Sequence, residues 1–239
     1  MEVKPQIVIQ DLQGFHNKQP YEANAKKNAY KDLSTICIVP TRGVIAAKVV
    51  QYFMSIMPPM NQKFTRIFMI GMEVGAAYNA AIENILVHPD LSQWKYVLFL
   101  EEDNMPPPDG LLRLYENMDK YDVIGALYWT KGVDGRPMCY GRTDIIPGNF
   151  VPFMPASDMV TPCRGVGMGF SLAKLEIFKH PKHPRPFFET VQRYQAGIGA
   201  QAYTQDLKWC EEIGKLGYKI AVDGRVKVGH YDFENDVVW

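Results

Sequence analysis

The sequence lacks the cysteine patterns that mark metal-binding or disulfide-stapled proteins. Its four cysteines, Cys37, Cys139, Cys163 and Cys210, are far apart and form neither a Cys-x-x-Cys pair nor a cluster with histidine. This spacing argues against a structural zinc site and favours reduced thiols in a cytoplasmic setting. Cys37 and Cys210 lie within apolar patterns and are expected to be buried.

An excess of one charge and long apolar runs are also missing. The 239 residues contain 26 Lys plus Arg and 26 Asp plus Glu, so the bulk charge does not indicate binding to nucleic acid or to an anionic membrane. The apolar runs are far shorter than the roughly 18–20 residues that span a bilayer. No charged region followed by an apolar run begins the chain, so we expect a soluble protein without a signal peptide.

What the sequence does contain is a regular alternation of apolar strands and amphipathic helices. A continuous apolar run over residues 35–39 ends at Pro40, and helical spacing follows over residues 44–57. The alternation then continues with strands predicted at 66–70, 96–100 and 123–128 and helices at 76–87 and 110–118. This order predicts an α/β fold with a mainly parallel central sheet flanked by helices, and ligand binding at the carboxyl ends of the strands.

The two ends of the chain are less regular. Residues 1–33 are polar and are interpreted as an arm that is packed on the rest or partly disordered, whereas residues 34–239 are predicted to form one domain. Within that domain we predict a loop with short strands at 131–162, a glycine-rich turn leading into a helical pattern at 165–178, a helix at 204–216, and short strands at 218–222 and 225–228.

An acidic tip follows the strand predicted at 96–100. Strand geometry places Glu101 and Asp103 on the same side, where two converging carboxylates would repel each other. A divalent cation relieves that repulsion, and Mg²⁺ or Mn²⁺ is the expected ion because hard oxygen ligands select hard ions. The alternative is that these acids stabilise the start of the helix near Asp109, but three intervening prolines weaken that interpretation.

An apolar strand that ends in acid-x-acid, followed by a proline-containing loop and a helix, resembles the metal-binding motif of glycosyltransferases of the glycosyltransferase-A fold, similar to family 2. The resemblance implies a single Rossmann-like domain. Members typically carry Asp-x-Asp, whereas this chain has Glu101-x-Asp103, which makes Asp103 the safer ligand. In many members a histidine near the C-terminus completes the metal site, and His230 matches that position. A histidine without a ligand role is the alternative.

The same resemblance implies a set of contacts to a nucleotide-sugar donor. Its candidates follow the predicted strands, open the second predicted helix, or belong to a run of alternating glycines. They are Pro40, Thr41, Arg42, Glu73, Asn79, Glu102, Gly167 and Gly169. In the family, backbone amides of the glycine segment face the transferred sugar. Ordinary turns and helix starts are the alternatives at each position.

Asp206 is the candidate general base. It follows Thr204, a plausible N-cap, so a helix start that favours an acid is a sufficient structural explanation. In the family, however, such an acid begins a helix about ten residues before Leu-Gly-Tyr, and Leu216-Gly217-Tyr218 follows here. The resemblance therefore implies that Asp206 deprotonates the acceptor hydroxyl.

Together these features predict metal-dependent transfer of a sugar from a nucleotide-diphosphate sugar to a hydroxyl acceptor, with inversion at the anomeric carbon. A sugar-1-phosphate nucleotidyltransferase is the nearest alternative enzyme, and a non-catalytic nucleotide- or carbohydrate-binding module is the alternative outside enzymes. The sequence leaves the donor base and the oligomeric state open. The acceptor is equally open: a glycan, a metabolite, a protein or a modified nucleic-acid base.

Overall fold

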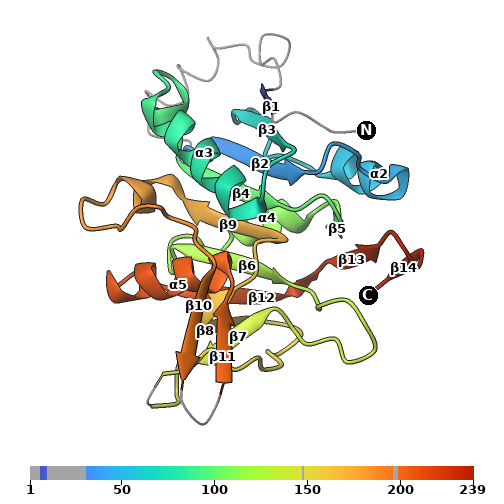
Figure 1. The fold of residues 1–239 in the computed structure, drawn as a ribbon. Helices are drawn as coiled ribbons and strands as arrows, with labels where there is room; N and C mark the ends of the chain where they lie inside the picture. The colour runs from blue at the N-terminus through green and yellow to red at the C-terminus, as the bar shows by residue number, and fades with distance from the viewer. Residues whose placement is uncertain (1–5, 10–30, 147, 196–198) are drawn as a thin grey trace.

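A nine-stranded sheet forms the centre of the molecule (Figure 1). The computed structural model describes residues 6–9, 31–146, 148–195 and 199–239. The strands of this sheet are β1 (Gln6–Ile9), β2 (Thr35–Thr41), β3 (Phe64–Ile70), β4 (Tyr96–Leu100), β6 (Val123–Leu127), β7 (Cys139–Arg142), β8 (Val160–Val166), β9 (Phe170–Lys174) and β12 (Ile220–Lys227). They lie in the order β1-β3-β2-β4-β9-β6-β12-β8-β7.

The strand directions bring the expected ligand-binding ends together. β3, β2 and β4 pair in parallel, and so do β6 and β12. Between these two groups lies β9, which is antiparallel to both β4 and β6, so that β4 and β6 point the same way. The residues that follow β2, β4, β6 and β12 therefore emerge at one edge of the sheet.

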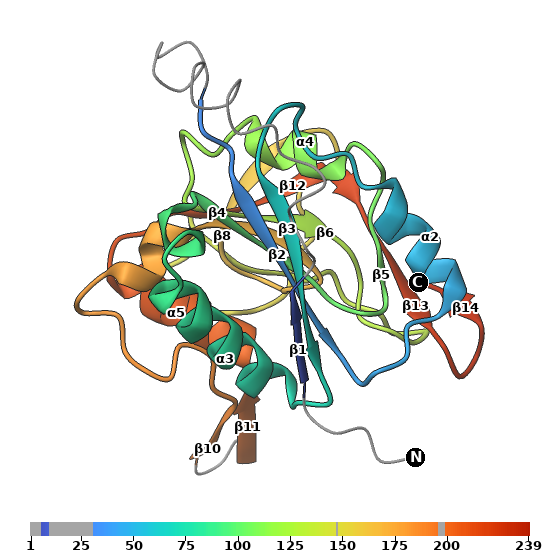
Figure 2. The same cartoon turned by 90° about the horizontal axis from the view of Figure 1, so that it is seen from above.

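Helices cover both faces of the sheet (Figure 2). The helices α3 (Val74–Val87) and α5 (Gln205–Lys215) pack on one face, and α2 (Ala47–Ser55) and α4 (Gly110–Tyr115) pack on the other. Side chains of β2 alternate between the two cores: Ile36 and Ile38 join the core under α3 and α5, whereas Cys37 and Val39 join the other. Burial on both faces explains why the strand is continuously apolar.

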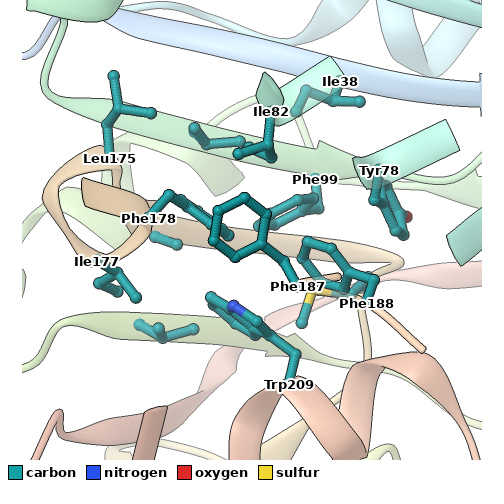
Figure 3. Packing of buried hydrophobic residues seen from close by; sticks show 14 of the residues in the cluster. Ile38, Tyr78, Ile82, Phe99, Leu175, Ile177, Phe178, Phe187, Phe188 and Trp209 are labelled. Atoms are coloured by element: carbon teal, nitrogen blue, oxygen red, sulfur yellow. The ribbon is translucent and has the colours of Figure 1, made fainter. Parts of the chain in front are cut away.

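An aromatic cluster fixes α5 to the sheet (Figure 3). The fully buried Trp209 stacks on Phe178 and Phe188 with ring centroids 5.4 Å apart in both pairs, and Phe99 of β4 packs edge-on to it at 5.9 Å. Trp209 is therefore part of the core. Because it lies one helical turn after the start of α5, this packing also fixes the position of Asp206.

The predicted alternation up to residue 128 is confirmed, but two later predictions are wrong. Residues 165–178 do not form a turn and a helix: they complete β8, form β9 and end in a 3₁₀ segment, η2 (Leu175–Lys179). Phe170 and Leu172 are buried in the centre of the sheet, which helical spacing alone does not reveal. The two short strands predicted at 218–222 and 225–228 form one strand, β12, with a register shift between Asp223 and Lys227.

Smaller elements surround this sheet. The 3₁₀ turn η1 (Leu91–Gln93) precedes β4, and β10 (Val191–Gln195) pairs with β11 (Gly199–Tyr203). A three-stranded sheet combines β5 (Asn104–Met105), β13 (Gly229–Asp232) and β14 (Val237–Val238). The helix predicted at 110–118 ends at Tyr115.

The predicted N-terminal arm is described only in part. Residues 6–9 form β1, which pairs antiparallel with β3 at the edge of the sheet, and residues 1–5 and 10–30 lie outside the described residues. Across the described ranges, none of the helices has the length and apolar character needed to cross a membrane.

Candidate active site

A tight turn over residues 101–104 begins the candidate site. β4 ends at Leu100, and the amide of Asn104 donates to the carbonyl of Glu101 at 3.1 Å. The expectation that Glu101 and Asp103 share a face assumed that the strand continues. Because the chain turns instead, the carboxylates of Glu101, Glu102 and Asp103 contact different partners.

Asp103, Lys131 and His230 form what we call the outer group. Asp103 Oδ2 lies 2.5 Å from Lys131 Nζ and 3.4 Å from His230 Nε2. Lys131 follows β6, and His230 lies on β13, which pairs directly with β5 opposite Asn104. Burial opposes ionisation of Asp103, but contacts with His230 and Lys131 outweigh it and lower its pKa to about 2. The structure thus brings together two of the predicted metal ligands, Asp103 and His230.

The orientation of His230 suits a metal ligand. Its Nδ1 lies 2.7 Å from the carbonyl oxygen of Trp129, which can only accept, so Nδ1 carries the hydrogen. With the hydrogen of a neutral ring on Nδ1, the lone pair of Nε2 would be directed toward a cation held by Asp103, an arrangement typical of histidines that bind metals. The ring of Tyr128 packs edge-on against the imidazole with centroids 5.6 Å apart.

The outer group fits a divalent cation that takes only a few of its ligands from the protein. Neighbouring ligands of an octahedral ion with bonds of about 2.1 Å lie about 3 Å apart, which is close to the 3.4 Å between Asp103 Oδ2 and His230 Nε2. Among the described residues no group of three or more His, Cys, Asp or Glu side chains is placed to hold an ion. Magnesium and manganese sites often have this character, because water and substrate phosphates supply the other ligands.

Glu101, Tyr78 and Asp206 form what we call the inner group. The hydroxyl of Tyr78, on α3, donates to Glu101 Oε1 at 3.2 Å. Burial and the negative charges of Asp103 and Asp206 together raise the pKa of Glu101 to about 8, although the Tyr78 hydrogen bond and the charge of Lys131 act in the opposite direction. Glu101 is therefore largely protonated near neutral pH in the absence of a metal ion.

Asp206 lies in the first turn of α5 and is buried, with 5% of its surface exposed. Its Oδ1 accepts a hydrogen bond from the amide of Leu207 at 2.9 Å. Burial raises the pKa of Asp206 above its usual value, whereas hydrogen bonds from Thr204 and Leu207 lower it. A buried carboxylate near a largely protonated Glu101 is well suited to accept a proton, and its role as a base stays a prediction.

Glu102 ties the acidic turn to the end of β2. Its Oε2 accepts from Thr41 Oγ1 at 2.6 Å and from the amide of Arg42 at 2.9 Å, and its Oε1 accepts from Arg42 Nε at 2.5 Å. Pro40 is buried within β2 next to this contact. A cleft of about 210 Å³ opens beside it and is lined by Arg42, Glu102 and Asp103 together with Val44, Ala46, Tyr231 and Phe233.

Glu73 and Asn79 have structural contacts of their own. Glu73 is the N-cap of α3 and accepts from the amide of Ala76 at 2.9 Å. Asn79 holds the backbone of Phe188: its Nδ2 donates to the Phe188 carbonyl at 2.7 Å, and its Oδ1 accepts from the Phe188 amide at 3.0 Å. These contacts account for both residues without a ligand, and their contact with a donor stays a prediction.

The side chains of Tyr128 and Asn104 lie so close to residues 167 and 169 that both positions require glycine. A Cβ at Gly167 would lie 2.2 Å from the hydroxyl oxygen of Tyr128, and one at Gly169 would lie 2.5 Å from Oδ1 of Asn104. The amide of Gly169 donates to the Tyr128 hydroxyl at 2.9 Å. The close approach predicted for a ligand is thus made by Tyr128, and the Gly169 amide is already engaged.

Sequence reasoning missed Lys131 and Tyr128 as members of the site. Both are at or just after the end of the strand predicted at 123–128, and ligands of such sheets bind at the carboxyl ends of the strands. The signal was therefore present. Neither residue belongs to a recognisable motif, so only the tertiary arrangement shows that they contact Asp103 and the glycine segment.

No protein-family model matches the sequence, and no curated protein sequence matches it. Solved structures do match. A197 from STIV is 17% identical with a TM-score of 0.58, covering 86% of this chain and 92% of that one. GalNAc-T7, crystallised with UDP, GalNAc and Mn²⁺, is 11% identical with a TM-score of 0.52. That match covers 84% of this chain but only 44% of the GalNAc-T7 chain.

At these identities the matches establish the fold. The chain shares with these structures a central sheet covered by helices on both faces, which is the glycosyltransferase-A architecture. This chain therefore has the glycosyltransferase-A fold, and the fold prediction is confirmed, with β9 and β8 making the sheet mixed.

Proposed function

We propose that this protein is a glycosyltransferase that uses Mn²⁺ or Mg²⁺ to transfer a sugar from a nucleotide-diphosphate sugar to a hydroxyl acceptor. The observation that carries the proposal is the outer group: Asp103 and His230 converge at the carboxyl edge of the sheet, 3.4 Å apart, beside the cleft at Arg42. In support, GalNAc-T7 shares the fold and was crystallised with UDP, GalNAc and Mn²⁺.

In this proposal Asp103 and His230 hold the cation. When bound, the cation supplies Lewis-acid stabilisation of the charge that develops on the leaving diphosphate. Lys131 Nζ lies 2.5 Å from Asp103 Oδ2, so its positive charge would also stabilise the same phosphates. Arg42, whose side chain is 82% exposed, is anchored through Nε to Glu102 and keeps its remaining N–H groups for the nucleotide.

The inner group supplies the proton acceptor. The acceptor oxygen forms a bond to the anomeric carbon, the bond from that carbon to the diphosphate oxygen breaks, and the acceptor proton passes to Asp206. A base positioned opposite the leaving group gives inversion at the anomeric carbon.

Donor hydrolysis tests the proposal without knowledge of the acceptor. Wild type would be incubated with a panel of nucleotide sugars in Mn²⁺, Mg²⁺ or EDTA, and release of nucleotide diphosphate would be measured. We expect metal-dependent release from one donor. Asp103→Ala should reduce this release by at least about 10³-fold, because it removes a ligand of the cation that stabilises the leaving diphosphate. Asp119→Ala, an exposed acid away from the site, is the matched control.

Two outcomes contradict the proposal. Hydrolysis that persists in EDTA and in Asp103→Ala would show that the outer group holds no catalytic cation. If no donor is cleaved and calorimetry finds no metal-dependent binding of any nucleotide sugar, the protein is a binding module of another kind.

A further inference from the structure

The hairpin formed by β13 and β14 carries His230, one of the two proposed cation ligands. The two strands pair antiparallel, and the amides of His230 and Trp239 each donate to the carbonyl of the other at 3.0 Å. On its other side β13 pairs with β5 at two positions. Both residues of β14, Val237 and Val238, are exposed. Because the pairing with β5 is so short, the position of His230 depends on how the rest of the hairpin is held.

Tyr231 connects this hairpin to both members of the cation pair. It follows His230 directly in β13, and its amide donates to the carbonyl of Asp103 at 2.7 Å. Tyr231 is buried, with 6% of its surface exposed, and belongs to the core under α2 and α4. Asp103 Oδ2 and His230 Nε2 lie 3.4 Å apart. A displacement of Tyr231 would therefore change the distance between the two ligands.

Asp236 holds the side chain of Tyr231 in place. It lies in the turn between β13 and β14, and its Oδ1 accepts from the Tyr231 hydroxyl at 2.8 Å. The same oxygen accepts from the ammonium of Lys48, in the first turn of α2, which also lies 5.7 Å from the centroid of the Tyr231 ring. Asp236 has a φ of 52°, a left-handed conformation that Asp and Asn adopt more readily than most residues. We call Tyr231, Asp236 and Lys48 the clasp.

The clasp joins the two walls of the cleft proposed for the donor. One wall precedes α2 and the other belongs to the hairpin, and their residues are Val44, Ala46, Tyr231 and Phe233. α2 and the hairpin lie at the same end of the molecule (Figure 2). The side chains of Lys48 and Asp236 are 57% and 64% exposed, so their ion pair contributes little by itself. The hydrogen bond from Tyr231 to the charged carboxylate is the stronger part of the clasp.

We propose that Tyr231 and Asp236 are positioning residues of the donor site, which hold the hairpin closed so that Asp103 and His230 stay at cation-binding distance. This inference rests on the proposed function, because the cation belongs to that proposal. When the hairpin opens, the site loses one of its two protein ligands. The apparent affinity for a cation falls with the fraction of molecules that are closed, so a loosened clasp weakens binding although neither ligand is changed.

Titration of the full chain with Mn²⁺, followed by the electron paramagnetic resonance of the free ion, tests this inference. We expect Tyr231→Phe and Asp236→Ala to weaken Mn²⁺ binding by about three- to tenfold, because each removes the hydrogen bond that closes the turn. Asp236→Asn should stay within about twofold of wild type, since its amide oxygen still accepts from Tyr231 and asparagine adopts the same backbone conformation. Tyr194→Phe and Asp119→Ala, at exposed positions elsewhere, are the matched controls.

Hydrogen exchange of the backbone amides reports on the hairpin itself. In EDTA, the amides of His230 and Tyr231 should exchange about three- to tenfold faster in Tyr231→Phe and Asp236→Ala than in wild type. Mn²⁺ should slow the same amides in wild type, because closure favours the cation and the cation therefore favours closure. Exchange in β4 should be the same in all variants, which distinguishes a loosened hairpin from a general loss of stability.

The outcomes separate this inference from the proposed function. If wild type binds Mn²⁺ and both clasp variants bind it equally well, the inference is overturned and the proposed function stands. Equal weakening in Asp236→Asn and Asp236→Ala also overturns it, since the charge of Asp236 and not its hydrogen bond would then act on the site. A wild type that binds no Mn²⁺ contradicts the proposed function and removes this inference with it.

Discussion

The outer and inner groups shift the pKa values of two acids from the same short turn in opposite directions. Asp103 lies against Lys131 and His230, and its pKa falls to about 2. Glu101, two residues earlier, faces a tyrosine hydroxyl and two other acids, and its pKa rises to about 8. One turn therefore presents a permanent negative charge on one side and a largely neutral acid on the other. The difference is set by partners from other strands and helices, since the two residues share the same local backbone.

The most severe test of this comparison is Asp206→Asn. The amide is nearly isosteric but cannot accept the acceptor proton, so we expect donor hydrolysis to slow by about 10²–10⁴-fold. Affinity for the nucleotide diphosphate with Mn²⁺ should stay within about twofold, because the outer group is unchanged. Steady-state hydrolysis and calorimetry measure the two quantities, with Asp119→Asn, an exposed acid away from the site, as control. Unchanged hydrolysis would remove Asp206 from the role of base.

Glu101→Gln should change the pH dependence of stability. The carboxyl keeps its proton up to about pH 8 when folded but only to about pH 4.5 when unfolded. Its contribution to stability is therefore full below about pH 4.5 and is lost as pH rises through 8. At about 1.36 kcal/mol per pH unit the loss is at most about 5 kcal/mol, and we expect about 3 kcal/mol because the turn can relax.

Urea unfolding in EDTA at pH 5, 7 and 9 measures this effect. The free energy of unfolding of wild type should fall toward pH 9 by about 3 kcal/mol more than that of Glu101→Gln. Glu176→Gln, at an exposed position, should follow wild type. Parallel profiles for wild type and Glu101→Gln would mean that Glu101 is ionised in the folded protein and that the two groups do not differ as described.

Lys131→Met tests the outer group with the smallest expected effect. Removing the ammonium frees Asp103 from a competing cation, so Mn²⁺ alone should bind a few-fold more tightly. This corresponds to a gain of about 1 kcal/mol in binding free energy. Titration followed by the electron paramagnetic resonance of free Mn²⁺ measures the affinity, with Lys95→Met as control. Weaker Mn²⁺ binding would instead show that Lys131 holds Asp103 in its binding orientation.

The position of this site could be predicted from sequence more completely than its geometry. The run 96–100 locates the acidic turn because a buried strand is continuously apolar and its end is marked by charge. The predicted repulsion between Glu101 and Asp103 is present, but the strand ends at Leu100, and a turn closed by a hydrogen bond between residues 101 and 104 sets the different partners of the two carboxylates. His230 was found only through resemblance, since its contact with Asp103 joins distant parts of the chain.

Other features depend on contacts that no local pattern carries. The alternating glycines predict a close approach, but only the folded chain shows that Tyr128 makes it. β9 was missed because its neighbours, β4 and β6, are far away in sequence and determine its burial.

The position of β9 also determines when this sheet can form. β6 pairs only with β9 and β12 in the described sheet, and both follow it in the chain. During synthesis, β2, β3 and β4 can pair early, but β6 has no strand partner until residues 170–174 emerge from the ribosome. A central strand that arrives late makes assembly non-local and slow. The acidic turn and the residues after β6 can therefore meet only near the end of folding, so the candidate site forms together with the complete sheet.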